Sequence, residues 1–287
     1  MGDQSLLQPH ELAALDRRDA EAAIRAHVQS AYLGDNTALT RILGRYKFFV
    51  DTRDHGFGSH ILLDGFWEIW LTLFCARNLH TGMIAVDVGA NFGYYSLMFA
   101  EFVGAPGHVV AVEPNPHAAD LLRRSVDLNG FLSRTTIARV ALGADDDATV
   151  PFYIPASEPK NALVVPSAAS VNLDRGELIE VPSLRLDKLC TGRGAIDFVK
   201  IDAEGSEERI YAGMQEIIER DRPMIVMEFN VARYHDPGAF IEQIFGTYGT
   251  LYTINFDGSA AEVTRLQLLT ERIGEDWLLV MSPQVPD

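Results

Sequence analysis

The stretch Val86-Asp87-Val88-Gly89-Ala90-Asn91-Phe92-Gly93 decides the fold. It begins in the apolar run Met83–Val88, which is typical of a buried strand, and it leads into the helical pattern of Gly93–Phe102. Glycines at such a turn let backbone approach a ligand closely, and the following helix N-terminus points amides at its polar groups. The stretch therefore predicts a nucleotide-like cofactor above the end of a strand.

The pattern around this stretch predicts an α/β fold with a mostly parallel sheet and helices on both faces, since short apolar runs alternate with helical ones. The predicted strands are Met83–Val88, His108–Glu113, Thr135–Leu142, Ile196–Asp202, Met224–Asn230, Thr250–Asn255 and Trp277–Ser282. The predicted helices between them are Gly93–Phe102, His117–Asn129, Ser206–Arg220 and Pro237–Tyr248.

The glycine spacing and the charge favour one cofactor over another. Dinucleotide sites use G-x-G-x-x-G, whereas this loop has only Gly89 and Gly93. Asp87 would lie unfavourably near a pyrophosphate but suits a cation, and S-adenosylmethionine carries an ammonium and a sulfonium. Glu113, at the end of the second strand, is placed to accept hydrogen bonds from ribose hydroxyls. Asp202 and Glu204 follow another strand and are expected at the same edge of the sheet.

The segments outside this pattern are an N-terminal extension and one long stretch of weak signals. We expect a helix over Pro9–Leu33, a short helix over Thr37–Leu43 and a strand over Arg45–Asp51. Residues 1–63 would form a helical extension that shapes substrate entry or a dimer contact, and residues 64–287 the cofactor-binding domain. The segment Pro155–Pro182 reads as a functional loop.

Composition limits the partners. Among 287 residues, 24 Lys and Arg face 40 Asp and Glu, and the net charge of −16 repels nucleic acid and anionic lipid. The two cysteines, Cys75 and Cys190, cannot build a disulfide framework. The N-terminus lacks the pattern of a secretory signal, and no run of about 20 apolar residues could span a membrane. We expect a cytoplasmic protein whose partners are small molecules.

The chain resembles the FkbM-type methyltransferase family in a series of motifs that occur in the family's order. These motifs are Gly65-Phe66-Trp67-Glu68, Asp87 to Ser96, Glu113-Pro114-Asn115-Pro116, Leu128-Asn129, Ala141-Leu142-Gly143, Leu186-Asp187, Lys200-Ile201-Asp202-Ala203-Glu204-Gly205 and Glu228. The resemblance implies a Rossmann-like class I methyltransferase that converts S-adenosylmethionine to S-adenosylhomocysteine. It also implies an acceptor hydroxyl on a sugar or a polyketide-type natural product.

The residues and the resemblance together give a set of candidate site residues. Those expected to bind the cofactor are Glu68, Asp87, Gly89, Ala90, Asn91, Gly93, Tyr94, Ser96, Glu113, Pro114, Asn115, Ala141 and Asp202. The candidate catalytic residues are Asp202, Glu204 and His235, because a carboxylate or an imidazole could take the proton of an attacking hydroxyl.

Three questions stay open at the level of the sequence. Asp202, Glu204 and Glu228 offer oxygen atoms that suit Mg²⁺, but no tight spacing fixes a metal, and none is assigned. An NAD-dependent oxidoreductase or a non-catalytic scaffold that binds the cofactor are the alternative functions. The N-terminal extension is compatible with a homodimer.

Overall fold

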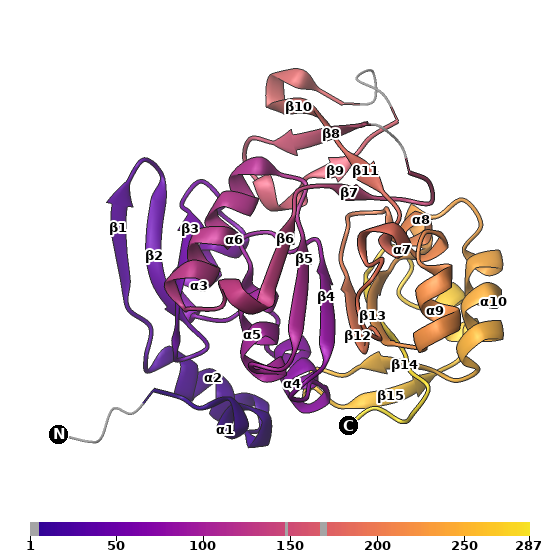
Figure 1. The fold of residues 1–287 in the computed structure, drawn as a ribbon, viewed down its shortest axis with the longest axis horizontal. Helices are drawn as coiled ribbons and strands as arrows, with labels where there is room; N and C mark the ends of the chain where they lie inside the picture. Colours follow the sequence, from indigo (N-terminus) through magenta and orange to yellow (C-terminus); the bar gives the residue numbers. More distant parts are fainter. Residues whose placement is uncertain (1–5, 147–148, 167–170) are drawn as a thin grey trace.

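The computed structural model describes residues 6–146, 149–166 and 171–287. Its centre is an eight-stranded sheet with the order β15-β14-β16-β13-β12-β4-β5-β6, and all seven predicted strands contribute to it (Figure 1). The strands are β4 (Ile84–Val88), β5 (His108–Val112), β6 (Thr135–Ala138), β12 (Phe198–Ile201), β13 (Met224–Phe229), β14 (Leu251–Ile254), β15 (Ala260–Val263) and β16 (Trp277–Met281). The sequence analysis missed β15.

The sheet is mostly parallel, as predicted. Strand β16 is antiparallel to β13 and β14, and β15 is antiparallel to β14, whereas β6, β5, β4, β12 and β13 pair in parallel. The chain enters the sheet at β4, builds outward through β5 and β6, and then returns to place β12 on the other side of β4. This reversal makes a crevice at the carboxyl ends of β4 and β12, where open α/β sheets bind ligands.

Helices cover both faces of the sheet, and the pleat of the strands divides the core between them. Ala85 and Val109 face one cluster, while their neighbours Val86 and Val110 face the other. The first face packs against α4 (Ile69–Asn78), α5 (Tyr94–Val103) and α6 (Pro116–Leu128). The second packs against α7 (Leu186–Leu189), α8 (Glu207–Ala212), α9 (Gln215–Asp221), α10 (Pro237–Tyr248) and α11 (Arg265–Thr270). The helix predicted over Ser206–Arg220 is thus two helices.

The N-terminal extension is not mainly helical, which corrects two predictions. The helix expected over Pro9–Leu33 is α1 (Pro9–Ala14), α2 (Arg17–Arg25) and a strand, β1 (Ser30–Gly34). The helix expected over Thr37–Leu43 is β2 (Thr37–Ile42), which pairs with β1 and with the predicted third strand, β3 (Tyr46–Asp51). Helix α3 (Phe57–Asp64) follows.

The turn between β1 and β2 explains why this segment forms strands where helices were predicted. Asp35 and Asn36 both have positive φ, at 47° and 54°, which makes a two-residue hairpin loop between β1 and β2. Burial then alternates along β2, as in a strand with one face on the core. The prediction that the N-terminus lacks a secretory signal includes residues 1–5, which lie outside the described residues. Within the described part, no helix combines the length and hydropathy needed to cross a bilayer.

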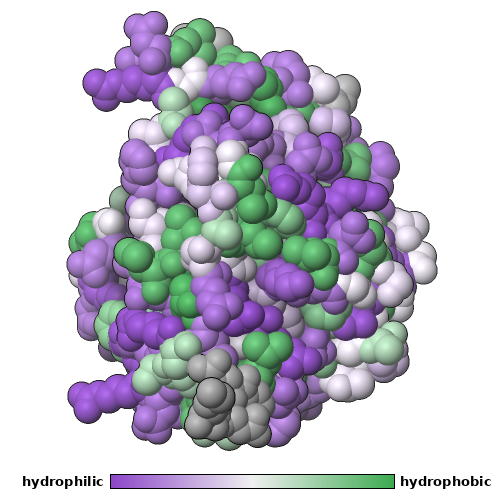
Figure 2. Space-filling model, turned by 90° about the vertical axis from the view of Figure 1, so that its left-hand side faces the viewer, coloured by the Kyte–Doolittle hydropathy of each residue, from purple (hydrophilic) through white to green (hydrophobic). Residues whose placement is uncertain are grey.

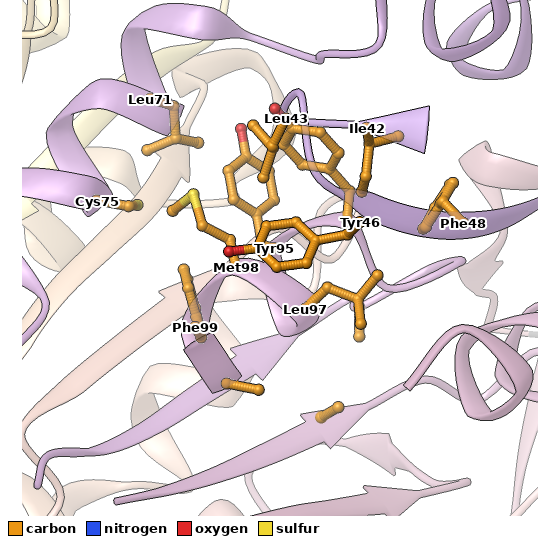
Figure 3. Packing of buried hydrophobic residues seen from close by; sticks show 14 of the residues in the cluster. Ile42, Leu43, Tyr46, Phe48, Leu71, Cys75, Tyr95, Leu97, Met98 and Phe99 are labelled. Atoms are coloured by element: carbon orange, nitrogen blue, oxygen red, sulfur yellow. The ribbon is translucent and has the colours of Figure 1, made fainter. Parts of the chain in front are cut away.

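The N-terminal sheet shares its core with the central sheet. Ile42 and Phe48, from β2 and β3, belong to the same cluster as Leu97 and Phe99 of α5 (Figure 3). Cys75 of α4 lies in this core as a buried free thiol. The outer side of the N-terminal segment meets solvent, and Figure 2 shows hydrophobic and hydrophilic residues interspersed on that face.

The stretch predicted as a loop over Pro155–Pro182 contains regular structure. Strands β8 (Val150–Pro155), β9 (Leu163–Val164) and β10 (Gly176–Val181) form an antiparallel sheet with the order β10-β8-β9, which we call the cap sheet. Two short strands, β7 (Ala141–Leu142) and β11 (Ser183–Leu184), pair in parallel beside it. The cap sheet lies beyond the carboxyl ends of β4 and β5 (Figure 1).

Candidate active site

A pocket at the carboxyl ends of β4, β5, β12 and β13 gathers most of the predicted site residues. Cap-sheet strands β8 and β9 and the start of α4 complete its walls. The predicted residues that line it are Glu68, Gly89, Ala90, Asn91, Tyr94, Glu113, Pro114, Ala141, Asp202 and Glu204. Those that do not line it are Asp87, Gly93, Ser96, Asn115 and His235.

The glycines after β4 also serve chain packing, although Gly89 lines the pocket and Gly93 does not. Gly89 has φ of 73°, and a Cβ atom there would overlap the backbone carbonyl of Asp202. Gly93 has φ of 95°, and a Cβ there would overlap the side chain of Leu122 in α6. Gly89 thus lets the loops after β4 and β12 meet, and Gly93 lets α5 begin against α6.

Glu113 is fixed by the loop after β4. Its Oε2 accepts a 2.7 Å hydrogen bond from the backbone N–H of Asn91, and its Oε1 accepts one of 2.7 Å from the N–H of Asn115. Burial nevertheless raises the pKa of Glu113 to about 7. Each carboxylate oxygen has a second lone-pair direction, so the group can still accept hydrogen bonds from a ligand. Asn115 itself caps α6 through its side chain.

Asp87 lies behind the pocket rather than in its wall, which corrects its predicted contact with a cationic ligand. The side chain is fully buried, and Ser96 Oγ donates a 2.6 Å hydrogen bond to its Oδ2. Position 87 of β4 pairs in register with Lys200 of β12, and Lys200 Nζ lies 4.0 Å from Asp87 Oδ1. The cation that Asp87 faces is therefore a lysine of this chain.

Lys200 is the main residue that the sequence analysis missed. Its side chain is 3% exposed, its Nζ donates a 3.1 Å hydrogen bond to Asp202 Oδ2, and it lies 4.9 Å from the centre of the Tyr95 ring. Burial lowers the pKa of Lys200, but Asp202, Asp87 and Glu68 raise it by more, so the ammonium stays charged. A lysine inside the apolar strand Phe198–Ile201 was the available signal, because a buried lysine needs charged partners.

Glu68 and Glu228 are carboxyl groups in a poorly solvated part of the pocket. Glu68 precedes α4 with φ of 37°, and Tyr95 Oη donates a 3.3 Å hydrogen bond to its Oε2. Burial, reinforced by the charge of Asp202, raises the pKa of Glu68 to about 7. Burial and the same charge also raise the pKa of Glu228 well above its usual value. Both groups can therefore exchange protons near neutral pH.

Glu204 and Arg233 form the rim of this region. Glu204 has φ of 50°, and its Oε2 lies 3.7 Å from Arg233, which also binds Glu228 Oε2 at 3.1 Å. Glu204 does not cap the next helix. The N-cap residue of α8 is Ser206, and Glu207, the first residue of the helix, holds the preceding loop because its Oε1 accepts from the backbone N–H groups of Ala203 and Gly205 at 3.0 and 3.1 Å.

The cap sheet brings aromatic and basic groups to the pocket. Lys160 Nζ lies 5.3 Å from the centre of the Trp67 ring, and both residues line the pocket together with Phe152. Trp67 also packs edge to face on Phe57 of the hydrophobic core, with ring centres 5.3 Å apart, so it joins the core to the pocket wall. No sequence pattern indicated Lys160.

His235 and a metal ion find no support in the geometry. His235 is exposed in the turn before α10 and outside the pocket wall, so we do not carry it into the mechanism. Among residues 6–146, 149–166 and 171–287, no group of three His, Cys, Asp or Glu side chains is arranged to hold a metal.

The comparison with protein families decides the class. Residues 87–252 match the model of the Methyltransferase FkbM domain, which is more than half of the chain. The chain belongs to the FkbM methyltransferase family. The pocket residues from Asn91 to Glu228 all fall within the matched range.

Individual relatives are similar to this FkbM-family chain over stretches of different length. It is 30% identical over 200 residues to 31-O-demethyl-FK506 methyltransferase FkbM from Streptomyces tacrolimicus, which covers 61% of this chain and 75% of that one. It is 38% identical over 50 residues to a protein-L-isoaspartate O-methyltransferase from Methanothrix thermoacetophila, covering 17% of this chain and only 24% of that relative. A solved FkbM methyltransferase from Methylobacillus flagellatus is 17% identical with a TM-score of 0.43, covering 70% of this chain and 43% of that chain.

Proposed function

We propose that this FkbM-family methyltransferase transfers a methyl group from S-adenosylmethionine to a hydroxyl of a small molecule of the sugar or polyketide type. The observation that carries the proposal is the convergence of Glu68, Glu113, Asp202 and Glu204 on one pocket at the switch point of the sheet. The name of the Streptomyces tacrolimicus relative describes methylation of a demethylated FK506, which supports an oxygen acceptor.

The residues of the pocket fit this methyl donor. Glu113, held by the N–H groups of Asn91 and Asn115, can accept hydrogen bonds from two ribose hydroxyls. Val112, Ala141 and Leu142 offer an apolar slot for the adenine ring. Several carboxyl groups favour a cationic ligand and disfavour a pyrophosphate, since only Lys160 and Lys200 bring positive charge to the wall.

When bound, the donor supplies an electrophilic methyl group on a sulfonium. The chain must then hold the acceptor oxygen behind that methyl, exclude water and take up one proton. Lys160 and Trp67 bring the cap sheet and the start of α4 together over the pocket, which limits the access of water. Asp202, oriented by Lys200, and Glu204 are our candidates for the proton acceptor, and Glu68 would orient the donor.

Calorimetry and a transfer assay test the proposal together. S-adenosylmethionine and S-adenosylhomocysteine should bind to the full chain, whereas NAD should not. Transfer of a labelled methyl group should then occur to a hydroxyl compound but not to its deoxy analogue. Binding of NAD alone would contradict the proposal, and donor binding without turnover across many hydroxyl acceptors would favour a scaffold.

A further inference from the structure

A second cavity lies beside the first along the same edge of the sheet. Its volume is about 440 Å³, within the range of roughly 300 to 1,000 Å³ usual for small-molecule sites. Most of its wall is formed by Trp70 of α4, by residues 253–256 at the end of β14 and just after it, and by residues 276–278 at the start of β16. Glu68 and Glu228 line both cavities, so the two meet at these carboxyl groups.

Two buried polar atoms in this wall lack a hydrogen-bond partner within the described residues. They are Thr253 Oγ1 and Trp277 Nε1, and the Trp277 side chain is 94% buried, with 6% of its surface exposed. A buried donor or acceptor without a partner is destabilising. Both residues line this one cavity, where a ligand could supply the missing partners.

The charges in this wall nearly cancel. Arg233, which lies outside the wall, binds two of its acids, Glu228 at 3.1 Å and Asp276 at 3.3 Å, and Arg272 in the wall lies 4.5 Å from the centre of the Trp277 ring. Burial also raises the pKa values of Glu68 and Glu228, which weakens the preference of these acids for a cation. The cavity therefore favours neither an anion nor a cation.

The apolar part of the wall is aromatic. Trp70 and Phe256 pack edge to face with ring centres 5.2 Å apart, and Trp277 lies in the same wall. Aromatic rings combined with hydroxyl, indole and carboxyl groups suit a ligand that has both apolar faces and hydroxyl groups.

We propose that this second cavity binds the methyl acceptor as an uncharged, hydroxylated ring compound through Thr253 and Trp277. The acceptor's reacting hydroxyl would pass Glu68 and Glu228, where the two cavities meet, and enter the donor pocket, which Asp202 and Glu204 line. This inference rests on the proposed function, because it needs a donor in the first pocket.

The three tryptophans of the chain allow a direct test, since Trp67 lines the first cavity and Trp70 and Trp277 line the second. The indole N–H resonances of the ¹⁵N-labelled full chain are assigned by Trp→Phe substitution and followed by NMR. S-adenosylhomocysteine should shift the Trp67 resonance most. Methyl β-D-glucopyranoside, a neutral hydroxylated ring, should shift Trp277 and bind more tightly than glucuronate or glucosamine, which carry a charge.

Thr253→Val removes an unpaired buried hydroxyl in the wall of the second cavity. Its matched control, Thr135→Val, removes an unpaired buried hydroxyl outside that cavity. Thr253→Val should weaken glucoside binding about 2- to 10-fold, as expected for one hydrogen bond, without changing affinity for S-adenosylhomocysteine. Thr135→Val should change neither affinity. The inference is overturned if the glucoside leaves Trp277 unshifted at 100-fold excess or displaces S-adenosylhomocysteine. Failure of S-adenosylhomocysteine to bind would instead overturn the proposed function.

Discussion

Lys200 Nζ donates a 3.1 Å hydrogen bond to Asp202 Oδ2, so a buried lysine on β12 orients the carboxyl group that follows the same strand. The same ammonium lies 4.0 Å from Asp87 on β4 and thus joins the two strands whose ends form the crevice. The ordering of the pocket and the stability of the sheet therefore depend on one side chain.

The variant Lys200→Met should lose about 3 to 5 kcal/mol of unfolding free energy, because removing one partner of a buried ion pair leaves the other charge uncompensated. Urea unfolding measures the loss. The double variant Lys200→Met/Asp87→Asn should recover at least about 1 kcal/mol, since it also removes the buried charge of Asp87 that the single variant leaves without a partner. Equal stability of the single and double variants would show that Asp87 and Lys200 are not coupled.

The variant Asp202→Asn should reduce methyl transfer by about 10²-fold or more, in line with the contribution of a positioned proton acceptor. Its affinity for S-adenosylhomocysteine should change far less, because an asparagine can still accept the hydrogen bond from Lys200. Turnover and calorimetry on the same preparation separate the two effects. Glu262→Gln, an exposed residue of β15, is the control. A normal rate in Asp202→Asn would exclude Asp202 as proton acceptor and as orienting group.

Glu113 should make stability depend on pH. Burial raises its pKa in the folded chain from 4.5 to about 7, so between these values the folded state binds more protons than the unfolded state. Its contribution is fully present below pH 4.5 and is lost as the pH rises through 7. Glu113→Gln cannot titrate. Relative to the unsubstituted chain, this variant should therefore be more stable at pH 8 than at pH 5. Urea unfolding at both values checks this, and a constant difference would contradict it.

The variant Gly89→Ala should be strongly destabilising, because its Cβ would overlap the carbonyl of Asp202 and its φ is positive. Gly82→Ala is the matched control, with φ of 93° and no atom within 4 Å of the added Cβ. The control should lose only about 1 kcal/mol from the backbone conformation. Thermal unfolding should show a clearly larger drop for Gly89→Ala, and equal drops would mean that the loops after β4 and β12 can separate.

The central sheet could be predicted from the sequence because its strands are short, apolar and separated by helical patterns. The hairpin of β1 and β2 was missed because the helical spacing favours helices over Pro9–Leu33 and Thr37–Leu43, although Asp35-Asn36 between them also suits a tight hairpin loop. Strands β8 and β10 were missed because their pairing joins residues 21 to 31 apart across a segment with weak periodicity.

The sequence predicted that the candidate site residues gather at one edge of the sheet, because carboxyl ends of parallel strands meet there, and the structure brings most of them to one pocket. The partners of each acid could not be predicted. Whether Asp87 faces a ligand or Lys200 depends on the register between β4 and β12, which one sequence does not reveal. The approach of Lys160 to Trp67 and of Arg233 to Glu204 likewise depends on tertiary packing.

The hydrophobic core that β2 and β3 share with the helices of the central sheet limits how far this protein can be shortened. Deleting the segment before α3 would remove β3 from α6 and α1 and α2 from α4, and would leave the apolar residues of α4 and α6 exposed to water. The shortened enzyme would then aggregate during expression while retaining every pocket residue. Protein engineers would do better to vary the cap sheet and keep the residues before α3.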